Sequence, residues 1–349
     1  MNSGDTTISD LVMLADGTVY AVGHVEGGSL YFYELLLQRW DGSSWRQEAG
    51  PPFPAYYGSR ISGTSADDLW IIRPETGQTL VSHRKGGVWS TTDLSKTVWN
   101  FMPLDLDVPA PGRPWLVGCY GHSDHYSGCS SKVLEFRGGA WQPHDVPLEA
   151  QSLTARSPSE MWLVGHDHST GQPAVAFFDG TGWTLQSLPQ LHKPHGYRVT
   201  NWLASLKDVV SIGDELVAVG EVSWLDLGPD DELDEHEDDD GDDRWHSRSL
   251  LMRYSAGQWS YDISTHGPTG EQLSLALAGG EVWLTNGTSA LWRLSGTRWV
   301  QELALRDTTI GRLASWPGMP TAWAPVTVHV PHEFDNMLSS SRSEYWRVN

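Results

Sequence analysis

This chain has few cysteines, no long apolar segment and no recognisable leader. Only two of its 349 residues are cysteines, which is too few for a disulfide framework, although Cys119 and Cys129 could form a local bridge. No stretch of about 18 apolar residues occurs, so we expect no membrane span. The first residues, MNSGDTTISD, have neither the basic nor the apolar region of a secretory signal. We therefore expect a cytoplasmic protein, or a secreted one if a leader was removed.

Basic residues are also scarce. The chain has 23 Lys and Arg against 44 Asp and Glu, giving a net charge of −21. Eleven of the fourteen residues from Asp230 to Asp243 are acidic and none is Lys or Arg. Such a surface repels phosphate backbones, and no basic patch occurs elsewhere. We expect no nucleic-acid partner, and an anionic membrane surface is disfavoured for the same reason.

Motifs for nucleophilic catalysis are missing too. The chain contains no GxSxG, no glycine loop for phosphates and no cysteine in a catalytic context. We therefore assign no catalytic residue, and a non-enzymatic role is the leading hypothesis.

A recurring tryptophan is the main positive feature. Five of six copies have a glycine three residues earlier, and most follow an apolar run such as VYAVG, PWLVG, MWLVG or LVAVG; the copies are Trp45, Trp89, Trp141, Trp183, Trp259 and Trp299. A period of roughly 40–50 residues, made of short strands and tight turns, is typical of a β-propeller.

The repeat divides the chain into seven units of a single domain, 1–349. We expect four-stranded antiparallel blades over 8–47, 60–94, 101–146, 152–188, 202–263, 273–303 and 310–348, with an acidic insertion at 224–247. The last unit lacks the glycine turn and its tryptophan, so we predict three strands there. The residues before Ile8 are too few to lend that blade a strand. Six or eight blades remain alternatives.

The unit resembles those of kelch and Asp-box propellers, in which an apolar strand ends in glycine before a turn and an aromatic residue. It departs from both patterns. One glycine, not two, ends the strand, as in Gly23-His24, and Asp41 and Asp179 lie four residues before the tryptophan instead of five. The resemblance implies a propeller fold and no particular function.

Histidines are concentrated at one predicted end of the blades. We label the strands of a blade A to D from the axis outward; the B–C and D–A loops then share one face, the loop face. Twelve of the fourteen histidines map there: His24, His122, His125, His166, His168, His192, His195, His236, His246, His266, His329 and His332. We predict that His24, His122, His125, His166, His168, His329 and His332 could bind zinc, copper or iron. Solvated or structural histidines are the alternative, and Asp167 should point away from its two histidine neighbours.

Two other features suggest binding. The carboxylates of Asp234, Asp238, Asp240 and Asp242 could hold calcium or a basic partner, or form a solvated loop. The repeat tryptophans are explained by core packing, but Trp99, Trp224, Trp245 and Trp316 fall outside the repeat and could stack on a sugar.

These observations favour a monomeric propeller that binds a protein or a small molecule on the loop face, with a bound metal ion as an option. The first alternative is a metal-dependent enzyme (a hydrolase, lyase or oxidoreductase) with Asp167 or Glu221 as its base. The second alternative is a lectin, which requires exposed tryptophan.

Overall fold

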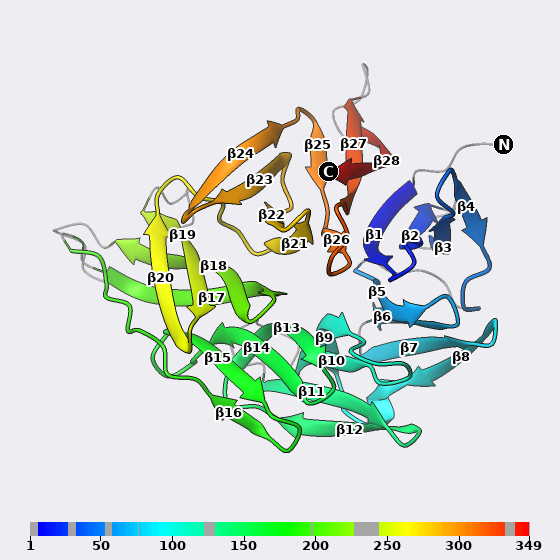
Figure 1. Cartoon of the computed structure of the whole chain (residues 1–349), viewed down its shortest axis with the longest axis horizontal. Helices are drawn as coiled ribbons and strands as arrows, with labels where there is room; N and C mark the ends of the chain where they lie inside the picture. Colours follow the sequence, from blue (N-terminus) through cyan, green and yellow to red (C-terminus); the bar gives the residue numbers. More distant parts are fainter. Residues whose placement is uncertain are drawn as a thin grey trace, which may run out of the picture.

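The chain forms a ring of seven antiparallel sheets around a central axis (Figure 1). The computed structural model describes residues 6–26, 33–52, 58–75, 77–121, 130–195, 197, 199–226, 244–331 and 339–348. In each sheet the first strand in the sequence lies nearest the axis and the later ones follow outward. The prediction of an all-β, seven-bladed propeller is therefore confirmed.

The first four blades follow chain order without exception. Their strands are β1 (Thr6–Met13), β2 (Val19–Glu26), β3 (Tyr33–Trp40) and β4 (Trp45–Glu48) in blade 1, and β5 (Arg60–Ser65), β6 (Asp68–Glu75), β7 (Gln78–Lys85) and β8 (Val88–Asp93) in blade 2, before the 3-10 helix η1 (Leu94–Lys96). Blade 3 has β9 (Phe101–Asp107), β10 (Trp115–Tyr120), β11 (Ser130–Arg137) and β12 (Ala140–Asp145), and blade 4 has β13 (Glu149–Ser157), β14 (Glu160–His166), β15 (Pro173–Phe178) and β16 (Trp183–Leu185).

The last three blades differ in strand length and regularity. Blade 5 has the three longest strands, β17 (Val199–Ile212), β18 (Glu215–Asp226) and β19 (Trp245–Ser255), followed by β20 (Gln258–Ser264). Blade 6 has β21 (Ser274–Ala278), β22 (Glu281–Thr285), β23 (Ala290–Ser295) and β24 (Arg298–Ala304). In blade 7 the inner position is shared by β25 (Thr308–Ile310) and β26 (Ala314–Ser315), which both pair with β27 (Ala322–Pro331), and β28 (Ser339–Val348) pairs with β27 as well. Blade 7 thus contains four strands arranged in three rows, because β25 and β26 lie on the same side of β27 and β28 lies on the other.

The first strand of each blade begins, and its last strand ends, within three residues of the blade range expected from the repeat. Strands β18 and β19 enclose the acidic insertion, whose residues 227–243 lie outside the described part of the chain.

The repeat tryptophans join neighbouring blades. Strand-D tryptophans of blades 3, 4 and 5 pack edge-on against a strand-B tryptophan of the preceding blade. The ring centroids are 6.0 Å apart for Trp70 and Trp141, 6.3 Å for Trp115 and Trp183, and 6.3 Å for Trp162 and Trp259, with interplanar angles of 85°, 80° and 72°. Edge-to-face pairs of this kind add stability beyond the area that they bury.

The glycine that ends strand B faces a β-bulge in strand A. In blade 4, Ala150 pairs with Gly165 and Ser152 with Val164, so one residue of strand A is unpaired. A Cβ atom on Gly165 would lie well under 3.0 Å from the carbonyl oxygen of Glu149. The same crowding occurs at Gly23, Gly118 and Gly220. The repeated glycine is therefore required by close backbone approach at the bulge.

The residue after each bulge links one blade to the next. In blades 1, 3 and 5 this residue is Asp10, Asp105 or Asp208. Each carboxylate accepts a backbone N–H from the following blade, with donor–acceptor distances of 3.0 Å from Ile61, 3.1 Å from Leu153 and 2.7 Å from Leu275. Buried acids thus join blades 1 and 2, 3 and 4, and 5 and 6 near the axis, whereas the hydroxyl of Ser274 accepts from the N–H of Leu313 between blades 6 and 7.

Candidate functional site

The histidines at the ends of the B strands are spread around the ring. His24 belongs to blade 1, His166 and His168 to blade 4, and His329 to blade 7. Blade 4 lies across the central axis from blades 1 and 7 (Figure 1). Among the described members of the predicted metal set, the structure brings His166 and His168 together on one blade, across the axis from His24 and His329.

His166 and His168 share one carboxylate. Glu149 Oε2 lies 2.8 Å from His166 Nε2, and Glu149 Oε1 lies 2.7 Å from His168 Nδ1. Burial lowers the pKa of His166, against the opposing effect of Glu149. A neutral imidazole that donates to Glu149 can accept at Nδ1 from Ser205, whose Oγ is 3.4 Å away. Ser205 is only 1% exposed. Its contact with His166 is therefore structural, and its hydroxyl is not an accessible nucleophile.

The other two described ligand candidates have separate surroundings. His24 is buried, which lowers its pKa, and His329 Nε2 lies 3.0 Å from Thr309 Oγ1. Within the described residues, no group of three or more His, Cys, Asp or Glu side chains is placed to hold a metal ion. His122, His125 and His332 lie outside that part of the chain.

The carboxylates considered as bases form local hydrogen bonds. Asp167 Oδ1 accepts from the backbone N–H and the hydroxyl of Ser169, at 2.8 and 2.7 Å. Glu221 Oε2 accepts from the backbone N–H of Gly270 at 3.0 Å. Both interactions stabilise loops of the loop face.

The predictions for the acidic insertion fall outside the described residues. Asp234, Asp238, Asp240 and Asp242 all belong to that segment. Cys119 is disulfide-bonded, and Cys129, the other cysteine of the chain, is also outside the described residues. No helix among the described residues is long and apolar enough to cross a membrane.

The four tryptophans proposed for ligand stacking have different environments. Trp99 and Trp245 are 65% and 52% exposed, whereas Trp224 is 1% exposed. The Trp224 ring stacks on His246 at a centroid distance of 5.2 Å and lies under Arg248, so it presents no face to a ligand. Trp316 is partly buried against the core shared by blades 1 and 7.

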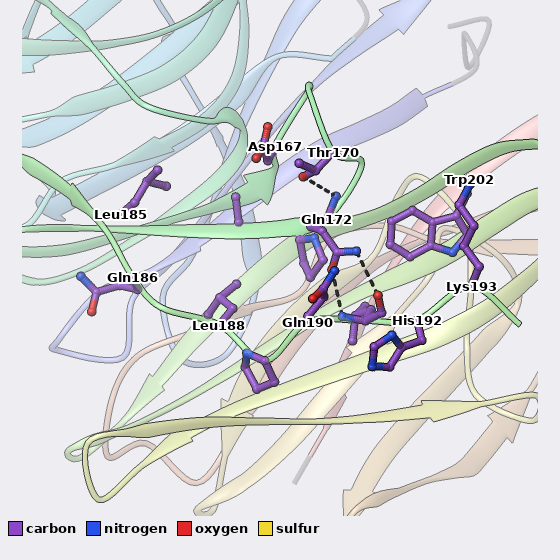
Figure 2. A pocket seen from close by; sticks show the side chains of 14 residues that line it. Asp167, Thr170, Gln172, Leu185, Gln186, Leu188, Gln190, His192, Lys193 and Trp202 are labelled. Atoms are coloured by element: carbon purple, nitrogen blue, oxygen red, sulfur yellow. Dashed lines mark hydrogen bonds between the residues drawn. The ribbon is translucent and has the colours of Figure 1, made fainter.

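A pocket of about 560 Å³ lies between blades 4 and 5 on the loop face (Figure 2). Its walls are the B–C turn of blade 4, the start of β15, the segment from Leu185 to Lys193, and Trp202 of β17. This segment belongs to the longest D–A connection in the ring, between Leu185 and Val199. The two blades therefore contribute different walls of one cavity.

Gln172 holds the two loops of the pocket together. Its Nε2 donates to the carbonyl of Leu191 at 3.0 Å, and its Oε1 accepts from the N–H of Leu191 at 2.9 Å (Figure 2). Leu191 itself is 2% exposed and packs in the core between blades 4 and 5. The backbone N–H of Ala204 donates to the carbonyl of Gly171 at 2.8 Å, which ties blade 5 to the same turn. These bonds make the pocket a preformed site.

The pocket has an apolar base and a polar rim. Leu188 and the indole of Trp202 are partly buried against the same core. The rim carries the amides of Gln186 and Gln190, the imidazole of His192 and the ammonium group of Lys193 (Figure 2). Pockets of this size with an apolar lining and a few convergent polar groups are typical of small-molecule sites.

A second polar cluster lies in the central channel, around a cavity of about 210 Å³. Arg312 Nη2 lies 2.9 Å from Asp105 Oδ1, and the hydroxyl of Ser152 lies 2.7 Å from Asp105 and 2.8 Å from Asp208. A hydroxyl has one proton, so both Ser152 contacts are hydrogen bonds only when a carboxyl is protonated. Burial raises the pKa of Asp208 and of Asp10. These groups are used in holding the blades together.

Sequence reasoning did not identify the pocket. It named His192 as a loop-face histidine but assigned no role to Trp202, Gln172 or Gln190. The available signal was the length and composition of the connection after strand D of unit four, LPQLHKPH. A long, polar loop at a fixed place on a rigid scaffold is where binding residues are concentrated.

Comparisons with known proteins identify the fold and no family. No protein-family model matches the chain, and no curated protein matches it either. The β-propeller domain of the Trilobed protease from Pyrococcus furiosus, described as having an open velcro topology, is 9% identical to this chain, with a TM-score of 0.55. The match covers 99% of this chain and 94% of that domain. YCF48 from Cyanidioschyzon merolae is 13% identical with a TM-score of 0.51 over 98% and 95%. A prolyl endopeptidase is 10% identical with a TM-score of 0.52, and this chain spans 50% of it.

Proposed function

We propose that this protein is a binding propeller that takes a small molecule in the pocket between blades 4 and 5. The observation that carries the proposal is the pocket itself, with its volume of about 560 Å³, its apolar base and its polar rim. Its position on the loop face agrees with the face expected from the sequence.

A binding role fits the chemistry of this face better than catalysis does. Three groups considered for catalysis are already engaged: His166 contacts Glu149 and Ser205, and Asp167 and Glu221 accept backbone N–H groups. An acid or base for catalysis must instead be within reach of a substrate proton. The pocket rim, by contrast, is lined by the amides of Gln186 and Gln190 and the ammonium group of Lys193.

Binding can be tested with a defined compound mixture. We would screen monosaccharides, amino acids, nucleosides and aromatic acids by ligand-observed NMR against wild type and Gln190→Trp, which places an indole in the pocket from an exposed rim position. Thr265→Trp, in the surface cavity between blades 5 and 6, is the matched control. We expect at least one compound to bind wild type and Thr265→Trp but not Gln190→Trp. Binding that persists in Gln190→Trp, or no binding by any class, would contradict the proposal.

Metal binding stays a separate proposal. A zinc, copper or iron ion at the loop-face histidines and calcium at Asp234, Asp238, Asp240 and Asp242 are expectations from the sequence. Elemental analysis of untagged protein, repeated on His166→Ala and His329→Ala, tests the first: stoichiometric metal lost in both variants would favour a metalloprotein.

A further inference from the structure

The pocket between blades 4 and 5 has a single aromatic wall. Trp202 of β17 supplies the indole, and the opposite side is formed by the segment that leaves blade 4, with the amides of Gln186 and Gln190 (Figure 2). A flat aromatic ligand would gain most from a slot with aromatic or apolar groups on both faces. The ligand that fits here has one apolar face and a polar periphery.

The rim supplies hydrogen-bonding capacity suited to hydroxyl groups. Gln172 uses one N–H and one oxygen lone pair on Leu191, which leaves a second donor and a second acceptor on the same amide. Among the described residues, the side chain of Gln190 forms no hydrogen bond. An amide both donates and accepts, and a hydroxyl does the same, so these groups are complementary to a polyhydroxylated ring.

Charge at the rim is mixed. Lys193 lies on the segment that leaves blade 4, and Asp167 lies on the B–C turn. Among the described residues that line the pocket, Lys193 is the one Lys or Arg, whereas a phosphate group is usually bound by several cationic side chains. The rim therefore favours hydroxyl and amide groups over a phosphate.

From these features we infer that the ligand class is a saccharide, bound as a pyranose ring whose C–H face lies on Trp202 and whose hydroxyls meet the amides of Gln172 and Gln190. This inference rests on the proposed function and names its ligand. The sequence-based expectation named exposed tryptophans such as Trp99 for stacking on a sugar. The residue inferred from the structure is a different one, Trp202, which belongs to strand β17, whereas Trp99 lies in an exposed loop.

The test uses methyl pyranosides of glucose, galactose, mannose, fucose and N-acetylglucosamine, with the open-chain polyol sorbitol as control. Binding is measured by saturation-transfer NMR and calorimetry. For a ligand of this size in one shallow site, we expect a Kd on the order of 1 mM for the best glycoside. Saturation should be strongest on the ring protons of one face, and sorbitol should not bind.

Four variants locate the binding surface. We expect Trp202→Ala to weaken binding about 10-fold or more, Trp202→Phe to retain it within a few-fold, and Gln190→Ala to lower it by about 3- to 10-fold. Trp99→Ala is the matched control, since it removes an exposed indole elsewhere, and should bind as wild type does. If Trp202→Ala does not fold, Trp202→Phe and Gln190→Ala still test the site.

The possible failures are distinguishable. If no glycoside binds while another compound class binds and is blocked by Gln190→Trp, the saccharide inference is wrong and the proposed function stands. If glycosides bind and Trp99→Ala abolishes binding while Trp202→Ala does not, the sugar site lies elsewhere and both proposals for this pocket are wrong.

Discussion

The indole of Trp323 in the last blade meets that of Trp45 in the first blade edge-on, with ring centroids 5.7 Å apart and an interplanar angle of 89°. Tyr345 of β28 stacks on the other side of the contact, 3.8 Å from Trp45 with planes 19° apart. The same kind of pair joins Trp70 to Trp141 and Trp162 to Trp259. Among the described strands, none is exchanged between blades 1 and 7. The ring closes through this aromatic contact together with the hydroxyl of Ser343, which donates to the carbonyl of Thr6 at 2.7 Å and accepts from the N–H of Ile8 at 3.2 Å.

Ring closure should depend on the coupling between Trp45 and Tyr345. We expect Trp45→Ala and Tyr345→Ala each to lower the free energy of unfolding by about 2–4 kcal/mol, because each removes a large aromatic contact. In a double-mutant cycle followed by chemical denaturation, the coupling should be about 0.5–1.5 kcal/mol. The pair Trp45→Ala and Trp99→Ala is the control and should be additive; a zero coupling for Trp45 and Tyr345 would contradict the closure role.

The glycines that end the B strands should not tolerate a side chain. In Gly165→Ala and Gly220→Ala the new Cβ would collide with the carbonyl oxygens of Glu149 and Ser205. We expect a loss of at least about 3 kcal/mol in unfolding free energy or failure to fold, as for other overpacked sites. Gly182→Ala has no atom within 4 Å of the added carbon and should unfold as wild type does within about 0.5 kcal/mol. Equal stability of Gly165→Ala and Gly182→Ala would show that the bulge can relax.

Asp107 should make stability depend on pH. Burial, and then the neighbouring Asp105, raise the pKa of Asp107 from 3.8 to about 6. Between pH 4 and 6 the folded state therefore retains a proton that the unfolded state has lost, so the free energy of unfolding falls as pH rises through this window and levels off above it. The total change is about 2–3 kcal/mol.

Asp107 accepts from the N–H of Val108 at 2.7 Å and from the N–H of Ala155 at 3.0 Å. Asp107→Asn removes the titrating group and retains one oxygen, which can accept from the N–H of Ala155. We expect this variant to be more stable than wild type at pH 7.5 and to lack that component of the slope. Denaturation at several pH values measures the effect, and Asp262→Asn, at an exposed position, is the control. A wild-type slope retained in Asp107→Asn would assign the effect to other acids.

Arg312 should hold the channel carboxylates in their ionised form. Burial opposes the charge of Arg312, but Asp105, Asp208 and Asp10 outweigh it and raise the pKa of the guanidinium. Arg312→Met removes the guanidinium paired with Asp105 and leaves Arg60 as the cation near these acids; breaking a buried ion pair typically costs about 3–5 kcal/mol. The loss should be smaller at pH 5 than at pH 8, because protonation of Asp10 and Asp208 relieves it. Arg298→Met, at an exposed position, should have little effect at either pH.

The repeat in the sequence determined the number of blades and most of their boundaries. Local rules suffice for this, because a glycine turn and an apolar strand are read from neighbouring residues. The repeated tryptophan indicated a packing role, and the structure identifies its partner as an aromatic side chain of the preceding blade. The role of the strand-B glycine was not predicted, since the carbonyl that it accommodates belongs to a strand about 15 residues earlier, across a bulge that no local pattern reveals.

The candidate site was decided by the tertiary structure. The sequence placed histidines at one end of the blades but could not say how far apart the blades would hold them, and His166 is paired with Glu149 instead of with His24 or His329. The pocket depends on Trp202 of one blade meeting a loop braced by Gln172 of another. Sequence periodicity determines what each blade contains. The closed ring determines which blades face each other, because its curvature and inter-blade packing set distances between residues that no local sequence relates.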